Sequence, residues 1–138
     1  GKQITVELRK DAENAIIHCD PNLMAHIAMN LVLNAKESIN ERGQLIIQTK
    51  IIEITENGRP PLNGIPQGRY LDICFADTGC GIGAKELNDV CNANFSNKEH
   101  HAGMGLSLAE EFTRQQAGYL RIESSKDRGT KVHLIFAC

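Results

Sequence analysis

A strand pattern that ends in an acidic, glycine-rich segment constrains the fold of this chain more than any other feature. Residues 69–77 read as a β-strand, and Thr-Gly-Cys-Gly-Ile follows at residues 78–82. Side chains alternate between the two faces of a strand, so Leu71, Phe75 and Asp77 are predicted to share one face. A carboxylate at the end of an apolar face is costly unless it is hydrogen-bonded. Asp77 therefore needs a hydrogen-bonding partner.

The two glycines after Asp77 indicate what that partner could be. Gly79 and Gly81 can take positive φ angles and let the backbone approach a flat ligand closely. A buried hydrogen-bond acceptor beside backbone that carries no side chains suits a flat heterocyclic base that offers an N–H donor. The alternative is a strand that simply ends in an Asp-Thr-Gly turn.

The composition indicates one globular domain over residues 1–138, although the abrupt start in a strand pattern suggests a piece of something larger. Hydrophobic residues make up 41% and charged residues 23%, and the formal net charge is −2. We therefore expect no nucleic-acid partner and no direct membrane contact. The five cysteines are odd in number and contain no Cys-x-x-Cys pair, which favours reduced thiols in a cytoplasmic protein over disulfides or a zinc site.

Periodicity and turn residues predict the order of the elements. Strands are expected at residues 4–9, 16–19, 44–54, 69–77, 119–124 and 130–136, helices at residues 21–41, 84–92 and 104–118, and loops at residues 57–68 and 93–103. Asp20 and Pro21 predict the start of the long helix, and Gly43 is expected to cap its end. Helices at the crossovers and hairpins between strands predict an α+β fold, a two-layer α/β sandwich in which helices cover one face of a mixed, mostly antiparallel sheet.

Two further segments carry groups that could bind a phosphorylated ligand. Residues 103–106 (Gly-Met-Gly-Leu) open a helix, where unpaired N–H groups can cradle phosphates. Lys98 in the preceding loop could reach a terminal phosphate, or it could be a solvated lysine. Asn34 lies in mid-helix, one turn after Asn30, where asparagine is unfavourable. Its amide oxygen could complete an octahedral Mg²⁺, and the alternative is that both asparagines bond within the fold.

Together these segments resemble the motifs of the histidine-kinase catalytic domain, in the kinase branch of the GHKL ATP-binding superfamily. Residues 30–35 are similar to its N box, residues 77–82 to its G1 box, residues 95–98 to its F box, residues 103–108 to its G2 box, and Gly129-Thr130 to its terminal Gly-Thr motif. The five motifs stand in the family's order and span nearly the whole chain. The Arg-Tyr pair that opens the central strand and the Asn-Ala-x-Glu form of the N box look closest to kinases that follow PAS-type sensor domains.

The resemblance implies a Bergerat fold that binds ATP between the sheet and a mobile lid at residues 93–105. Asp77 would accept the adenine amine, Gly81 would give the base room, and Thr130 would reinforce the hydrogen bonds around Asp77. The implied nucleotide-binding set is Asn30, Asn34, Asp77, Gly79, Gly81, Ile82, Phe95, Lys98, Gly103, Met104, Gly105, Leu106 and Thr130.

The resemblance also implies roles in catalysis for two residues of this set. Asn34 would hold Mg²⁺ between the phosphates with support from Asn30, and Lys98 would approach the γ-phosphate. The backbone N–H groups of Gly103, Gly105 and Leu106 would hold the phosphates.

Related ATPases of the gyrase B and heat-shock chaperone type carry a glutamate one helical turn before the Mg-binding asparagine. Asn30 occupies that position here and cannot act as a base, which favours transfer of the γ-phosphoryl group to a histidine over hydrolysis. Glu37, one turn beyond Asn34 on the same helix, carries a carboxylate that could accept a proton, and we interpret it as a group near Mg²⁺ or as a solvated carboxylate. None of the five histidines lies in a His-Glu-x-x-x-Pro context. We therefore expect the phosphoacceptor histidine on a separate helical dimerisation domain of a parent sensor kinase, with a response regulator downstream.

Departures from the family pattern leave two other functions open. The F box has a single phenylalanine with no preceding proline, and His101 stands where the G2 box often has its first glycine. A degenerate module that binds nucleotide, or nothing, and acts by docking would fit these changes. An anti-sigma-type serine kinase would share much of the site and differ in its protein substrate.

Overall fold

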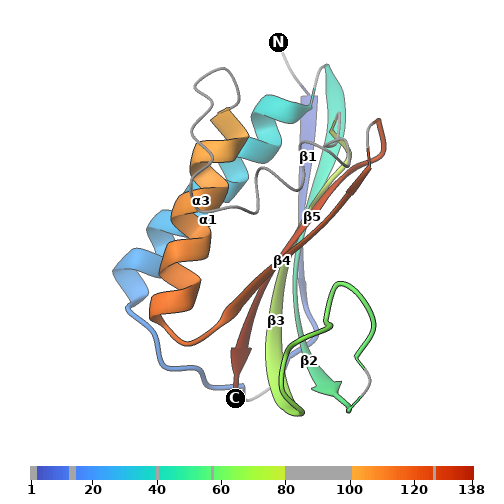
Figure 1. Ribbon diagram of the computed structural model, residues 1–138. Coiled ribbons are helices and arrows are strands. Elements are labelled where there is room, and N and C mark those ends of the chain that lie inside the picture. Colours follow the sequence, from blue (N-terminus) through green and yellow to red (C-terminus); the bar gives the residue numbers. More distant parts are fainter. Residues whose placement is uncertain (1–2, 13–14, 40, 57, 80–100, 126) are drawn as a thin grey trace.

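A computed structural model describes residues 3–12, 15–39, 41–56, 58–79, 101–125 and 127–138. Within these ranges, two helices pack on one face of a five-stranded sheet (Figure 1). The elements are β1 (Gln3–Lys10), α1 (Pro21–Ser38), β2 (Arg42–Ile54), β3 (Gly68–Asp77), α3 (His101–Gln115), β4 (Tyr119–Ser125) and β5 (Gly129–Ala137). None of the described helices combines the length and the apolar character that crossing a bilayer requires.

The strand order confirms the predicted fold class. The sheet runs β1-β2-β3-β5-β4, with β1 and β2 parallel and the other neighbours antiparallel. Parallel neighbours need a crossover connection, and α1 lies in the chain between β1 and β2. The fold is therefore a two-layer sandwich of α+β type with a mixed, mostly antiparallel sheet.

The main hydrophobic core lies between the two helices and the sheet. Its buried members from α1 and α3 are Ile27, Leu31, Leu106, Ala109 and Phe112, and those from β3 and β5 are Phe75, Val132, Leu134 and Phe136. The β3–β5 register pairs Phe75 with Val132 and, two residues on, Asp77 with Thr130. Because alternate residues share a face, Asp77 and Thr130 lie on the helix-covered face at the end of this core, as the strand pattern predicts.

The opposite face of the sheet carries a second, smaller core. Ile54, Tyr70 and Ile135 are buried there together with Ile65 of the connection between β2 and β3. The Tyr70 hydroxyl donates to the Pro66 carbonyl oxygen at 2.8 Å. The described part of the loop expected at residues 57–68 thus packs against the sheet.

Beside this second core lies a buried ion pair that the sequence does not predict. His133 Nδ1 lies 3.1 Å from both carboxylate oxygens of Asp72, and His133 Nε2 lies 3.3 Å from Glu123 Oε1. Burial lowers the pKa of His133, but its interactions with Asp72 and Cys74 outweigh burial and raise that pKa to about 10. His133 is therefore the cationic member of a buried pair at neutral pH.

Two predicted boundaries around α1 are wrong. Residues 16–19 form no strand and pair with none of the described strands. Ile17 and Cys19 of this irregular segment pack against the main core. The helix ends at Ser38 instead of residue 41, since Ile39 turns into an extended conformation and is only 1% exposed.

Gly43 does not cap this helix, because it lies in β2 and pairs with Ile4. A Cβ at Gly43 would come within 2.6 Å of Ile39 Cγ2, so the absence of a side chain at residue 43 allows β2 to pack closely against Ile39. At the other predicted helix, α3 begins at His101 instead of Met104. The predicted helix at residues 84–92 lies outside the described residues.

Candidate functional site

Asp77 ends β3 on the helix-covered face, and its carboxylate is half-buried. Its Oδ1 accepts a hydrogen bond from the Gly79 N–H at 2.8 Å, and Ser38 Oγ lies 3.5 Å from the same oxygen. Burial raises the pKa of Asp77, and hydrogen bonds from the backbone of Gly79 and Thr130 and from Ser38 oppose that rise. The carboxylate is thus oriented by protein donors while it keeps lone pairs for a further donor.

The backbone around Asp77 is packed too closely for side chains at two glycines. A Cβ on Gly79 would collide with Ser38 Oγ and come within 2.9 Å of Asp77 Oδ1. Gly129 has φ +90°, and a Cβ there would collide with the backbone carbonyl oxygen of Asp77. Both glycines therefore let neighbouring backbone approach Asp77.

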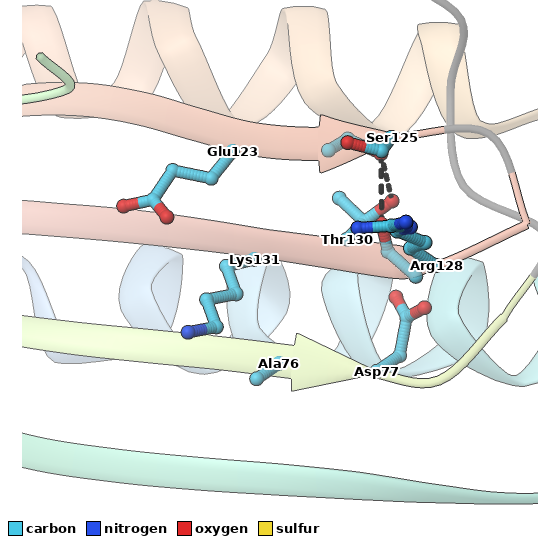
Figure 2. Close-up of a pocket in the computed structure, with 9 residues that line it drawn as sticks. Ala76, Asp77, Glu123, Ser125, Arg128, Thr130 and Lys131 are labelled. Atoms are coloured by element: carbon cyan, nitrogen blue, oxygen red, sulfur yellow. Dashed lines mark hydrogen bonds between the residues drawn. The ribbon is translucent and has the colours of Figure 1, made fainter.

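Two hydroxyl groups fix the strand ends next to Asp77. The Thr78 hydroxyl accepts from the Gln44 N–H at 2.9 Å, and the Thr78 N–H donates to the Gln44 carbonyl oxygen at 3.1 Å. The Thr130 and Ser124 hydroxyls lie 2.7 Å apart (Figure 2). The segment after β3 is thereby tied to the start of β2, while Thr130 is tied to β4.

A pocket of about 190 Å³ adjoins this site at the turn between β4 and β5 (Figure 2). It is lined by Ala76, Asp77, Glu123, Ser124, Ser125, Arg128, Gly129, Thr130 and Lys131. Ala76 and Lys131 are cross-strand partners one residue from Asp77 and Thr130, so they lie on the opposite face of the sheet. The pocket therefore spans the end of the sheet and is distinct from the expected space between sheet and helices.

The two asparagines of α1 stand in line with Asp77. Asn30, Asn34 and Ser38 follow one another at intervals of four residues, so they share one side of the helix. With a rise of about 1.5 Å per residue, Asn34 lies about 6 Å and Asn30 about 12 Å from Ser38 along the helix axis. This row leads away from the Asp77 carboxylate along α1.

Asn34 also carries an unsatisfied polar atom. Its Nδ2 is buried and has no hydrogen-bond partner among the described residues. A buried amide without partners is costly and is commonly explained by a ligand, an ion or a water. The Nδ2 group could therefore donate to an acceptor such as a phosphate oxygen, while the amide oxygen of the same side chain is the kind of ligand that Mg²⁺ prefers.

The start of α3 lies at the same end of the molecule as the end of α1 and the end of β3 (Figure 1). An α-helix leaves its first four N–H groups unpaired, which here belong to residues 101–104 and include Gly103 and Met104. Gly105 and Leu106 follow, where helical N–H groups pair with the helix's own carbonyls, and the Leu106 side chain is buried in the main core. The predicted site residues Gly81, Ile82, Phe95 and Lys98 lie outside the described residues.

The sequence interpretation misses one residue that the structure brings into this site. Ser38 contacts Asp77 from 39 positions away. Its place one turn after Asn34 in α1 is the signal that could have identified it.

Comparisons with known proteins show which family and which fold this chain resembles. The profile of the family described as "Histidine kinase-, DNA gyrase B-, and HSP90-like ATPase" matches residues 19–137. The sensor kinase CckA of Brucella abortus (strain 2308) is 26% identical over 132 residues, which are 94% of this chain and 14% of the relative. The sensor histidine kinase ZraS of Escherichia coli (strain K12) is 25% identical over 127 residues, 91% of this chain and 24% of the relative. The chain thus spans a quarter or less of these two relatives.

Solved structures share the fold. A nucleotide-free catalytic domain of the histidine kinase ThkA superposes with a TM-score of 0.70 at 19% identity, covering 96% of this chain and 79% of the other. The mycobacterial sensor histidine kinase MprB gives a TM-score of 0.70 at 18% identity and covers 96% of this chain and 80% of the other.

Proposed function

Because this chain belongs to the family of histidine kinase-, DNA gyrase B- and HSP90-like ATPases, we propose that it is the ATP-binding catalytic domain of a two-component sensor histidine kinase. The observation that carries the proposal is the Asp77 carboxylate, half-buried at the end of the core and oriented by Gly79, Ser38 and Thr130. The sensor-kinase names of the relatives and the kinase catalytic domains among the solved structures support it.

Asp77 would recognise the base. An ionised carboxylate accepts hydrogen bonds only, so it favours the exocyclic amine of adenine over the carbonyl oxygen that guanine presents at the same place. Gly79 and Gly129 keep the surrounding backbone bare of side chains. With its surroundings fixed in this way, Asp77 would bind and orient the nucleoside.

The phosphates would extend along α1 toward the start of α3. Asn34 would provide an amide oxygen to Mg²⁺ and Asn30 would support it, while first-turn N–H groups that include Gly103 and Met104 would hold phosphate oxygens. Lys98 would approach the γ-phosphate as a point charge. When bound, Mg²⁺ neutralises charge on the phosphate oxygens.

The reaction that this site favours is transfer to a partner histidine. Hydrolysis needs an oriented water and a proton acceptor, whereas an imidazole brings its own nucleophilic nitrogen. Asn30 stands where the related ATPases carry a glutamate, and it cannot accept a proton. The phosphoacceptor histidine would lie on a separate helical dimerisation domain of a parent kinase in the cytoplasm, and a response regulator would act downstream.

Calorimetric titration of Mg²⁺ with ADP or a non-hydrolysable ATP analogue tests this proposal. We expect the unaltered chain to bind, and Asp77→Asn to bind at least about tenfold more weakly, because a hydrogen bond to a charged acceptor is lost. Asn34→Ala should bind weakly or lose its dependence on Mg²⁺. His26→Ala, an exposed change on α1, is the control and should bind normally. Equal binding by all four proteins would contradict the site.

A second experiment separates the kinase from the ATPase. The chain alone should transfer little phosphate, and radiolabelled γ-phosphoryl should appear on a phosphoacceptor domain supplied in trans. A robust intrinsic ATPase that Glu37→Gln abolishes, with phosphotransfer intact, would contradict the assignment.

A further inference from the structure

We propose that Ser38 is a positioning residue of the nucleotide site, whose hydroxyl holds the Asp77 carboxylate in the orientation in which it meets the base. This inference rests on the proposed function and adds a residue to its base-recognition site. Ser38 is the last residue of α1, and Asp77 is the last residue of β3. The contact therefore joins the helix layer to the sheet layer at the site itself.

The Ser38 hydroxyl stands between two acceptors. Its Oγ donates to the Ala35 carbonyl oxygen at 2.9 Å and lies 3.5 Å from Asp77 Oδ1. A hydroxyl has one proton and rotates freely, so it can direct that proton to either oxygen. The Ala35 carbonyl also accepts from the Ile39 N–H at 3.2 Å, so it keeps a partner when the hydroxyl turns toward Asp77.

Gly79 holds the same carboxylate oxygen through its backbone. Its N–H donates to Asp77 Oδ1 at 2.8 Å, and a Cβ on Gly79 would collide with Ser38 Oγ. The Ser38 hydroxyl therefore occupies the space that a side chain at Gly79 would need. The missing side chain at Gly79 is what makes room for the serine, which explains why these two small residues occur together.

The hydroxyl also favours the ionised carboxylate. Burial raises the pKa of Asp77, and the bond from Ser38 is among the interactions that lower it. A bound base would exclude water from the carboxylate and make these donors more important. The charged residues around the site at the β4–β5 turn are Glu123, Arg128 and Lys131, and Glu37 lies next to Ser38 on α1. They stay the same in every variant compared below.

Calorimetric binding of ADP with Mg²⁺ between pH 5 and 8 tests Ser38→Ala. We expect the variant to bind about threefold to tenfold more weakly at neutral pH, as one lost hydrogen bond predicts. Binding needs ionised Asp77, and loss of the serine bond raises its pKa, so the acidic limb of the profile should move to higher pH. Thr113→Val is the matched control, because the Thr113 hydroxyl likewise donates to a helical carbonyl, that of Ala109.

Ser38→Cys, which fills similar space with a weak donor, should bind with intermediate affinity. If circular dichroism shows that Ser38→Ala does not fold, the same binding measurements between pH 5 and 8 are made on Ser38→Cys and interpreted in the same way. Unaltered affinity and pH profile in Ser38→Ala, with binding lost in Asp77→Asn, would overturn this inference and leave the proposed function intact. Weaker binding with an unmoved acidic limb would also overturn it, since a merely structural role would produce that result. No binding by the unaltered chain would overturn both.

Discussion

Val132 and His133 are neighbours in β5, and their side chains lie on opposite faces of the sheet. Val132 packs in the main core beneath the helices, whereas His133 forms its buried pair with Asp72 on the other face. The pair links β3 to β5, and its members lie 61 positions apart in the chain. Removing one partner of such a pair leaves an uncompensated buried charge, so the pair contributes to stability as a unit.

This pair predicts a pH dependence of stability. The pKa of His133 is raised in the folded state, from 6.5 to about 10, so its contribution is fully present below pH 6.5 and is lost as the pH rises through about 10. We expect the free energy of unfolding of the unaltered chain, relative to His133→Gln, to fall over this window in urea titrations. His26→Gln, at an exposed position, should show no such difference. A difference independent of pH would show that His133 is neutral in the folded chain.

At the scale of the element, the start of α1 is stabilised by a side-chain cap at its first turn. Asp20 caps the helix through Oδ1, which accepts from the N–H groups of Asn22 at 2.9 Å and Leu23 at 3.3 Å, and Pro21 follows as the first helical residue. The helix thus begins where its sequence predicts. Ser38 lies at the opposite end of the same helix, next to the candidate site.

Loss of this cap should weaken the fold without altering the site. Asp20→Ala should lower the free energy of unfolding by about 1 kcal/mol, because two N–H groups lose their acceptor. Asp20→Asn retains a side-chain oxygen and should stay close to the unaltered chain. Chemical denaturation measures both variants. Equal destabilisation by alanine and asparagine would show that the charge, and not the cap, is what matters.

At the scale of the whole molecule, the two layers depend on the core between them. Leu134 lies on β5 between β3 and β4, is fully buried, and belongs to the cluster that includes Phe75 and Phe112. The same core positions α1 against β3, and hence Ser38 against Asp77. Packing between the layers therefore determines the geometry of the site.

Leu134→Ala should destabilise the chain by about 2–5 kcal/mol, since it removes buried methyl groups and leaves a cavity. The matched control is Leu108→Ala on α3, where the side chain is 42% exposed and the expected change is within about 0.5 kcal/mol. The difference in stability between the two variants is measured by the shift in the denaturant midpoint, provided that the m-value stays constant. Similar losses in the two variants would mean that the main core lies elsewhere.

The sequence by itself determined the features that depend on local periodicity. Alternation along residues 69–77 placed Asp77 on the face of Phe75, and the Asp20-Pro21 pair located the start of α1. These predictions hold because the direction of a side chain and the capping of a helix depend on a few adjacent backbone angles. The order of strands and helices was sufficient for the fold class.

Only the tertiary structure decided which distant residues meet. Ser38 reaches Asp77 and His133 reaches Asp72 because the layers pack and the strands pair in one register, and no local pattern contains that register. Tertiary packing also overrode local signals, since Ile39 leaves the helix to enter the interior and residues 16–19 lack a strand to pair with. Burial and ladder pairing are properties of the assembled chain, so the sequence pattern alone could not determine them.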